Sequence, residues 1–209
     1  MPSRLEHAAY HEAGHAVIAT ILGAGLVSVG VWDTEDHEGA LGRVIAAEGE
    51  DRFVLGGPLE NGEIGHWGAK MIFALAGGIA EFVWSGTKNH RGMYRDWLEA
   101  LQASHHLVAE SGDDESARPQ HLRRAWLCAE EIVSGHWSAV AGLAQALCAR
   151  HHIEGQALTN TIASRLGAQP WITLRERADQ RFVDGDSGIW FDLVAAVQGH
   201  PGGVSWAED

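Results

Sequence analysis

The most constraining feature of the sequence is a capped, apolar segment near the N-terminus that also carries two histidines and a glutamate. Ser3 followed by Glu6 is a capping-box pattern, in which each side chain satisfies a free backbone N–H at the start of a helix. The pattern predicts a helix over residues 3–22, with Gly23 as its C-terminal stop. Any fold of this chain must therefore accommodate three polar side chains on a helix that is otherwise suited to a core.

The run of residues 16–32 is nearly uncharged and resembles a secretory leader or a short membrane span. Three glycines interrupt it, it falls short of about twenty strongly apolar residues, and acidic rather than basic residues precede it. We therefore expect the end of one helix followed by a buried strand, and no membrane span. A membrane anchor is the alternative interpretation of this run.

The remaining hydrophobic patterning predicts a mainly α fold with a small two- or three-stranded β element near residues 27–47. Short apolar runs predict strands at 27–32 and 41–46, joined by an acidic turn, and a Gly-rich, acidic loop follows at 48–65. Apolar residues at helical spacing predict further helices at 64–84, 92–110, 118–151 (which Ser134-Gly135 could break), 154–166 and, more weakly, 174–182 and 189–197.

Composition restricts the classes of function. The 209 residues are 45% hydrophobic and 21% charged, which is typical of one globular domain. The formal net charge of −13 disfavours binding to nucleic acid or to an anionic membrane surface. The two cysteines, Cys128 and Cys148, form no CxxC pair, so neither a disulfide framework nor a cysteine zinc site is indicated. We expect a cytoplasmic protein.

The sequence His11-Glu12-Ala13-Gly14-His15 is an HExxH motif within the predicted helix. Residues i and i+4 share one helix face, so both imidazoles can bind one zinc ion at about 2.0–2.1 Å. Glu12 would then lie beside the open coordination position and act as a general base. Metal-free histidines in a chance match are the competing interpretation, but burying these three polar side chains without a metal is costly.

A catalytic zinc ion needs a third protein ligand, and several downstream residues are candidates. Asp96 shares a helical stripe with apolar residues, so its carboxylate is predicted on a buried side, where an unpaired charge is costly. Glu81 lies on a small-residue helix face and is a candidate partner for a ligating histidine, or a lesser alternative ligand. A plain salt bridge explains Glu81 equally well. The other candidates are Glu35, Glu38, His90, His105 and His106. We interpret Glu35 and Glu38 as solvated and His105-His106 as a surface pair.

Several segments of the sequence, beginning with the HExxH helix, resemble a known family. The segment AYHEAGHA (9–16) is similar to the active-site helix of the peptidase domain of FtsH-like, ATP-dependent zinc metalloproteases. Further segments resemble that domain in order: GALG (39–42) its strand segment, LAGGIAE (75–81) its L-[AG]-G-R-x-A-E helix, GMYRD (92–96) its G-x-x-x-D segment, and 143–162 its closing helices. The resemblance covers residues 5–166.

The resemblance implies a mostly helical zinc-peptidase domain over residues 1–166, with zinc on His11, His15 and Asp96 and with Glu12 as the general base. Residues 167–209 match nothing in the family, and we expect them to pack as a C-terminal extension on the same domain. The family carries an ATPase module and a membrane anchor, but no GxxxxGK[ST] phosphate loop occurs here. We therefore expect a peptidase that acts without an ATPase of its own, with a separate ATPase as a candidate partner.

The leading hypothesis is thus a zinc metalloendopeptidase that cleaves peptides or unfolded protein segments. An extended peptide is expected to add to the edge strand near Leu41, Gly42 and Val44. The alternative is a catalytically inactive, zinc-stabilised binding or adaptor protein of the same fold. It is favoured by the absence of the phosphate loop and by Gly78, which stands where the family has arginine. A third hypothesis is a helical structural protein that binds no metal.

Overall fold

The computed structural model describes residues 2–34, 40–46, 65–166 and 171–185. In these ranges the chain is mainly helical, with one small antiparallel sheet. The elements are α1 (Arg4–Ile21), β1 (Leu26–Val31), β2 (Gly42–Ala46), α2 (His66–Ser85), α3 (His90–Ser111), α4 (Arg118–Gly135), α5 (Trp137–Arg150), β3 (His152–Glu154), α6 (Gly155–Ala163) and α7 (Trp171–Val183). This confirms the predicted mainly helical class. The helix expected at 189–197 and most of the loop expected at 48–65 lie outside the described residues.

The sheet has the order β2-β1-β3, with β1 pairing antiparallel to both neighbours. Val29 at its centre lies opposite Val44 on one side and Ile153 on the other. The sequence predicted β1 and β2 but not β3. Three residues between two helices are too few to show alternation, and His151 makes the turn into β3 in the left-handed region, at φ 64°.

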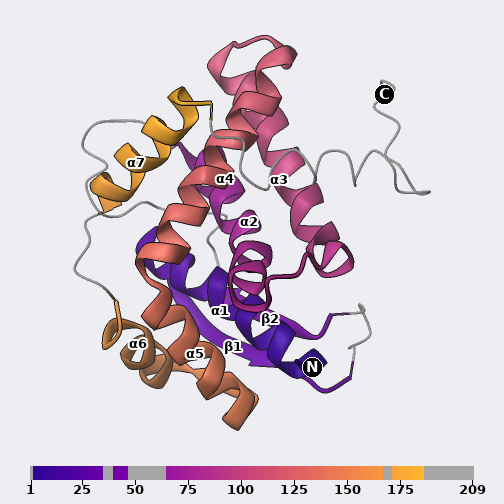
Figure 1. Ribbon diagram of the computed structural model, residues 1–209, viewed down its shortest axis with the longest axis vertical. Coiled ribbons are helices and arrows are strands. Elements are labelled where there is room, and N and C mark those ends of the chain that lie inside the picture. Colours follow the sequence, from indigo (N-terminus) through magenta and orange to yellow (C-terminus); the bar gives the residue numbers. More distant parts are fainter. Residues whose placement is uncertain (1, 35–39, 47–64, 167–170, 186–209) are drawn as a thin grey trace.

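The capping box predicted at the start of α1 is present. The Ser3 hydroxyl accepts a hydrogen bond from the Glu6 backbone N–H at 3.2 Å, and the Glu6 carboxylate accepts one from the Ser3 N–H at 2.8 Å. From this fixed start α1 runs between α2, α5 and the sheet, with most of its side chains buried (Figure 1). A helix packed on several sides needs small side chains where its neighbours approach, and the buried positions of α1 are accordingly rich in alanine.

The long helical stretch predicted at 118–151 is broken as the glycine suggested. α4 ends at Gly135, and α5 leaves it at an angle of 76°. α4 packs on α2 and α7, whereas α5 packs on α1 and α6. The helix α7 is held on α4 by buried Leu174 and Ala178, and by Arg181, which contacts the carboxylates of Glu130 and Glu131 at 3.0 and 2.9 Å.

None of the described helices is by itself both long and apolar enough to cross a membrane. Only the sharply bent pair formed by Glu115–Gly135 and Trp137–Arg150 reaches that length and apolarity, and it does so only when its two arms are taken together.

The helices α1 and α2 cross closely at Gly14. A Cβ atom built on this glycine would lie 2.6 Å from both the Ala76 carbonyl oxygen and the Ala80 Cβ atom. Small residues on both helices therefore set the separation of their axes.

We predict that Gly14→Ala lowers the free energy of unfolding. Helix propensity alone would add about 1 kcal/mol of stability. Overpacking against a helix backbone that cannot move aside costs about 1–3 kcal/mol, so we expect a net loss. Chemical denaturation measures the difference. Gly65→Ala is the control, because a Cβ atom there has no neighbour within 4 Å. A Gly14→Ala protein as stable as wild type would contradict the close crossing.

Candidate metal centre

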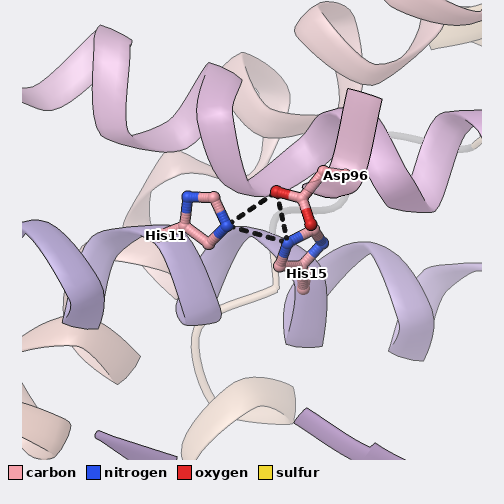
Figure 2. Close-up of side chains that lie close together, drawn as sticks. All are labelled: His11, His15 and Asp96. Atoms are coloured by element: carbon pink, nitrogen blue, oxygen red, sulfur yellow. Dashed lines mark hydrogen bonds and ion pairs between the residues drawn. The ribbon is translucent and has the colours of Figure 1, made fainter. Parts of the chain in front are cut away.

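Three side chains from two helices converge on one point (Figure 2). His11 and His15 lie one turn apart on α1, and Asp96 comes from α3. The two Nε2 atoms are 3.1 Å apart. The Asp96 Oδ2 atom lies 2.8 Å from Nε2 of His11 and 3.5 Å from Nε2 of His15. The structure therefore brings together the three residues that the sequence suggested as ligands, in a group that could hold a metal ion.

The spacing of the three atoms fits a tetrahedral ion. Ligand atoms at about 2.0–2.1 Å from a tetrahedral centre are about 3.3–3.4 Å from one another. The observed separations of 2.8, 3.1 and 3.5 Å bracket that value. Two imidazole nitrogens and one carboxylate oxygen are also a donor set that zinc accepts. By geometry and by chemistry the group is suited to zinc.

Hydrogen bonding fixes which ring nitrogens carry protons. The Nδ1 atom of His15 lies 2.8 Å from the Phe73 carbonyl oxygen, which can only accept, so Nδ1 donates. The Nδ1 atom of His11 lies 3.4 Å from a carboxylate oxygen of Glu81, which likewise requires a proton on Nδ1. In the neutral form of each ring, which is the form that binds a metal, Nε2 then carries the lone pair. Asp96 Oδ2 is buried and accepts no well-aligned hydrogen bond from a described residue. Three lone pairs thus face one another.

The electrostatics of the group favour a positive charge at its centre. Burial alone would lower the pKa of His11, but attraction by Asp96 outweighs burial and raises this pKa well above its usual range. The pKa of His15 is raised for the same reason. Burial would raise the pKa of Asp96, but the two histidines hold it well below its ordinary value. Without a metal ion, protons on the imidazoles supply this charge, and a bound cation would take their place, so uptake of the ion releases protons.

Glu12 lies in the same open cavity of about 990 Å³, which is also lined by the three converging residues. Its side chain is buried, and burial raises the pKa of its carboxyl group although both histidines oppose the shift. The backbone of β2 packs against this side chain: a Cβ atom on Gly42 would lie 2.8 Å from Oε1 of Glu12. A carboxylate held in this way and biased toward its protonated form is suited to accept a proton.

Glu81 lies beside the converging group rather than within it. One of its carboxylate oxygens faces Nδ1 of His11, and the other accepts hydrogen bonds from His7 at 2.6 Å and Asn89 at 2.8 Å. Of the three roles considered for Glu81, the geometry does not show that of a ligand, because Glu81 forms ion pairs with two histidines and lies outside the converging group. His7, Asn89 and Phe73 were not predicted. The position of His7, one helical turn before His11, could have indicated a third histidine on the same helix face, but a backbone carbonyl such as that of Phe73 leaves no signal in the sequence.

The other candidate ligands lie elsewhere or outside the description. His105 forms an exposed pair with Glu115 at 2.9 Å, and His106 stacks on Trp67 with ring centroids 4.2 Å apart. The side chains of Glu35, Glu38 and His90 are outside the described part of the chain. Where the family has arginine, a Cβ atom on Gly78 would lie against the side chain of Met93, so the glycine leaves room for this core methionine.

The edge of the sheet borders the same cavity. Leu41, Gly42 and Val44, the predicted peptide-binding residues, all line it. The Leu41 carbonyl accepts a hydrogen bond from the Trp32 N–H at 2.7 Å, which marks a hydrogen-bonded pair between β2 and β1. Because such pairs alternate along an antiparallel ladder, the backbone groups of Gly42 and Val44 point away from β1. Among the described strands, β2 pairs only with β1.

Two neighbouring glycines of α2 allow a matched test of the group. A Cβ atom on Gly77 would lie 2.6 Å from Nε2 of His11 and against Nε2 of His15, whereas the nearest neighbours of one on Gly78 are atoms of the flexible Met93 side chain. We predict that Gly77→Ala prevents stoichiometric zinc uptake, because the methyl group displaces both imidazoles, and that Gly78→Ala retains it. Metal analysis after dialysis against zinc measures both. Equal zinc contents in the two variants would contradict the proximity of Gly77 to the ligand atoms.

No protein-family model matches this chain, and no curated protein sequence matches it either. The resemblance of residues 5–166 to the FtsH-like peptidase domain therefore stays a prediction that rests on short motifs of the sequence.

Proposed function

We propose that this protein is a zinc-dependent metallopeptidase that hydrolyses peptide bonds in extended or unfolded substrates. The observation that carries the proposal is the convergence of three lone pairs, from His11, His15 and Asp96, within 2.8–3.5 Å of one another. Without a metal ion such a cluster must take up protons, whereas one bound cation satisfies all three lone pairs at once. The cluster shares its cavity with a buried glutamate and with the edge of a sheet.

The three converging residues would hold the ion. Three protein ligands are typical of catalytic zinc sites, because a fourth position is left for water or substrate. When bound, zinc acts as a Lewis acid that polarises a peptide carbonyl and makes water more acidic.

Glu12 supplies the proton transfers of the proposed reaction. Its carboxylate takes a proton from the attacking water as the oxygen–carbon bond forms at the peptide carbonyl. It then returns this proton to the peptide nitrogen as the carbon–nitrogen bond breaks, which gives a free acid and a free amine. Contact with the β2 backbone at Gly42 holds the carboxylate in place through both steps. The raised pKa of Glu12 favours the first transfer.

The substrate backbone is proposed to lie along β2. The outward-facing N–H and C=O groups of Gly42 and Val44 offer the hydrogen bonds of one further strand. Gly42 touches Glu12, so a strand added at this edge passes directly beside the general base. Backbone recognition of this kind is available only to a peptide that is extended at the point of cleavage.

The test of the function is Glu12→Gln. The amide has nearly the same shape as the carboxylate but accepts no proton, so we expect wild-type zinc content and a loss of casein hydrolysis of at least about 100-fold. Zinc content and the rate of peptide release are measured on the same preparation. Equal activity in the variant would contradict the role of Glu12. A wild-type protein that binds one zinc ion yet cleaves no peptide would favour the inactive binding protein instead.

Val44→Pro tests the edge strand. Proline removes the outward N–H of Val44 without removing a hydrogen bond to β1. Loss of one backbone hydrogen bond to the substrate should raise KM by roughly 2- to 10-fold. Val44→Ala is the control, because it shortens the side chain and keeps the N–H. Equal KM values in the two variants would show that the side chain, and not the backbone, contacts the substrate.

A further inference from the structure

We infer that Asn89 is a positioning residue that ties the start of α3 to the carboxylate behind His11, and so sets two of the three zinc ligands relative to each other. The inference rests on the proposed function, because it assigns Asn89 a role toward the proposed zinc ion. Asn89 does not lie in the converging group, and no motif of the sequence points to it.

The first arm of the contact is the amide nitrogen. Asn89 Nδ2 donates a hydrogen bond to Oε1 of Glu81 at 2.8 Å, and His7 Nδ1 donates to the same oxygen at 2.6 Å. With Oε1 held by two donors, Oε2 is directed at Nδ1 of His11, 3.4 Å away. The Glu81 side chain is only 2% exposed, so bulk water cannot replace a hydrogen-bond donor that a substitution removes. The orientation of this buried carboxylate thus depends on His7 and Asn89.

The second arm is the amide oxygen. Asn89 Oδ1 accepts a hydrogen bond from the Gly92 backbone N–H at 3.1 Å, which makes Asn89 the N-cap of α3. Space for this cap comes from Gly92 itself, since a Cβ atom there would lie 2.7 Å from Asn89 Nδ2. The backbone N–H requires an oxygen and the carboxylate requires an N–H donor, so only one orientation of the amide satisfies both partners.

The two arms act on different ligands. The cap fixes the first turn of α3, the helix that carries Asp96, while the amide nitrogen fixes the partner of His11. Serine and aspartate cap helices about as well as asparagine, but neither supplies the N–H donor that Glu81 accepts. Asparagine alone among the favoured cap residues performs both tasks. This requirement distinguishes a positioning role from an ordinary helix cap.

Asn89→Ser separates the two arms. The serine hydroxyl keeps the cap, carries no charge and is too short to reach Glu81. We expect the zinc dissociation constant to rise about 10- to 100-fold, as is typical when a partner of a ligating histidine is released. Competition with a chromophoric chelator measures the dissociation constant. Glu81 loses a donor in both Asn89→Ser and Asn89→Ala, but only Asn89→Ala also loses the cap, so the zinc-free Asn89→Ser protein should melt at a higher temperature than the zinc-free Asn89→Ala protein.

Asp114→Ala is the matched control. Asp114 caps the short helical turn Glu115–Ala117, where its carboxylate accepts from the Ser116 N–H, so the variant loses a cap away from the metal centre. It should lower stability and leave zinc affinity unchanged. Wild-type zinc affinity in Asn89→Ser, or an equal loss of affinity in Asp114→Ala, would overturn the role of Asn89. A wild-type protein that binds no zinc would overturn the proposed metal centre itself, a result distinct from either of these.

Discussion

The close approach of α1 and α2 is the constraint on which the rest of the structure depends. Gly14 on α1 leaves room for the Ala76 carbonyl, and Gly77 on α2 leaves room for the two imidazoles. The backbones of the two helices therefore approach each other at Gly14, and the backbone of α2 meets side chains of α1 at Gly77. This places the Phe73 carbonyl and the Glu81 carboxylate of α2 against the outer nitrogens of both histidines. A wider interface would leave these nitrogens without partners and both rings free to turn.

The same packing gathers ionisable side chains around one cavity. Glu12, Glu81 and Asp96 lie beside three histidines in or at the border of one cavity. Because a charged group removed from water is costly unless it is paired, each carboxylate here has a specific partner or faces the converging group. Hydrogen bonds from His7 and Asn89 hold Glu81, whereas Asp96 faces the two imidazoles.

Local signals in the sequence predicted much of the fold. The capping box gave the start of α1, apolar spacing gave α2 and α3, and the Ser134-Gly135 pair gave the break between α4 and α5. The strand β3 was missed, because its partner β1 lies more than a hundred residues earlier and three residues carry no pattern of their own. Local signals define elements, and pairing between distant elements leaves little trace in either segment.

The candidate site likewise contains residues with a local sequence signal and residues that depend on contacts between distant elements. The HExxH spacing and the carboxylate on an apolar stripe identified His11, Glu12, His15 and Asp96, which the fold brings to one cavity. The contacts that orient them, from His7, Asn89 and the Phe73 carbonyl, come from the packing of three helices. Side chains with distinctive chemistry can be recognised in a sequence. A backbone oxygen, or an amide whose role depends on where two helices meet, cannot.

The outward-facing backbone of β2 has a consequence for what the proposed enzyme distinguishes. Every residue except proline offers the same N–H and C=O groups, so an edge strand at this place reads conformation rather than amino-acid identity. A natively folded protein already uses these groups in its own helices and sheets. By binding along β2, the proposed enzyme would therefore select substrates that have lost their structure. A protein that stays folded would be protected from cleavage.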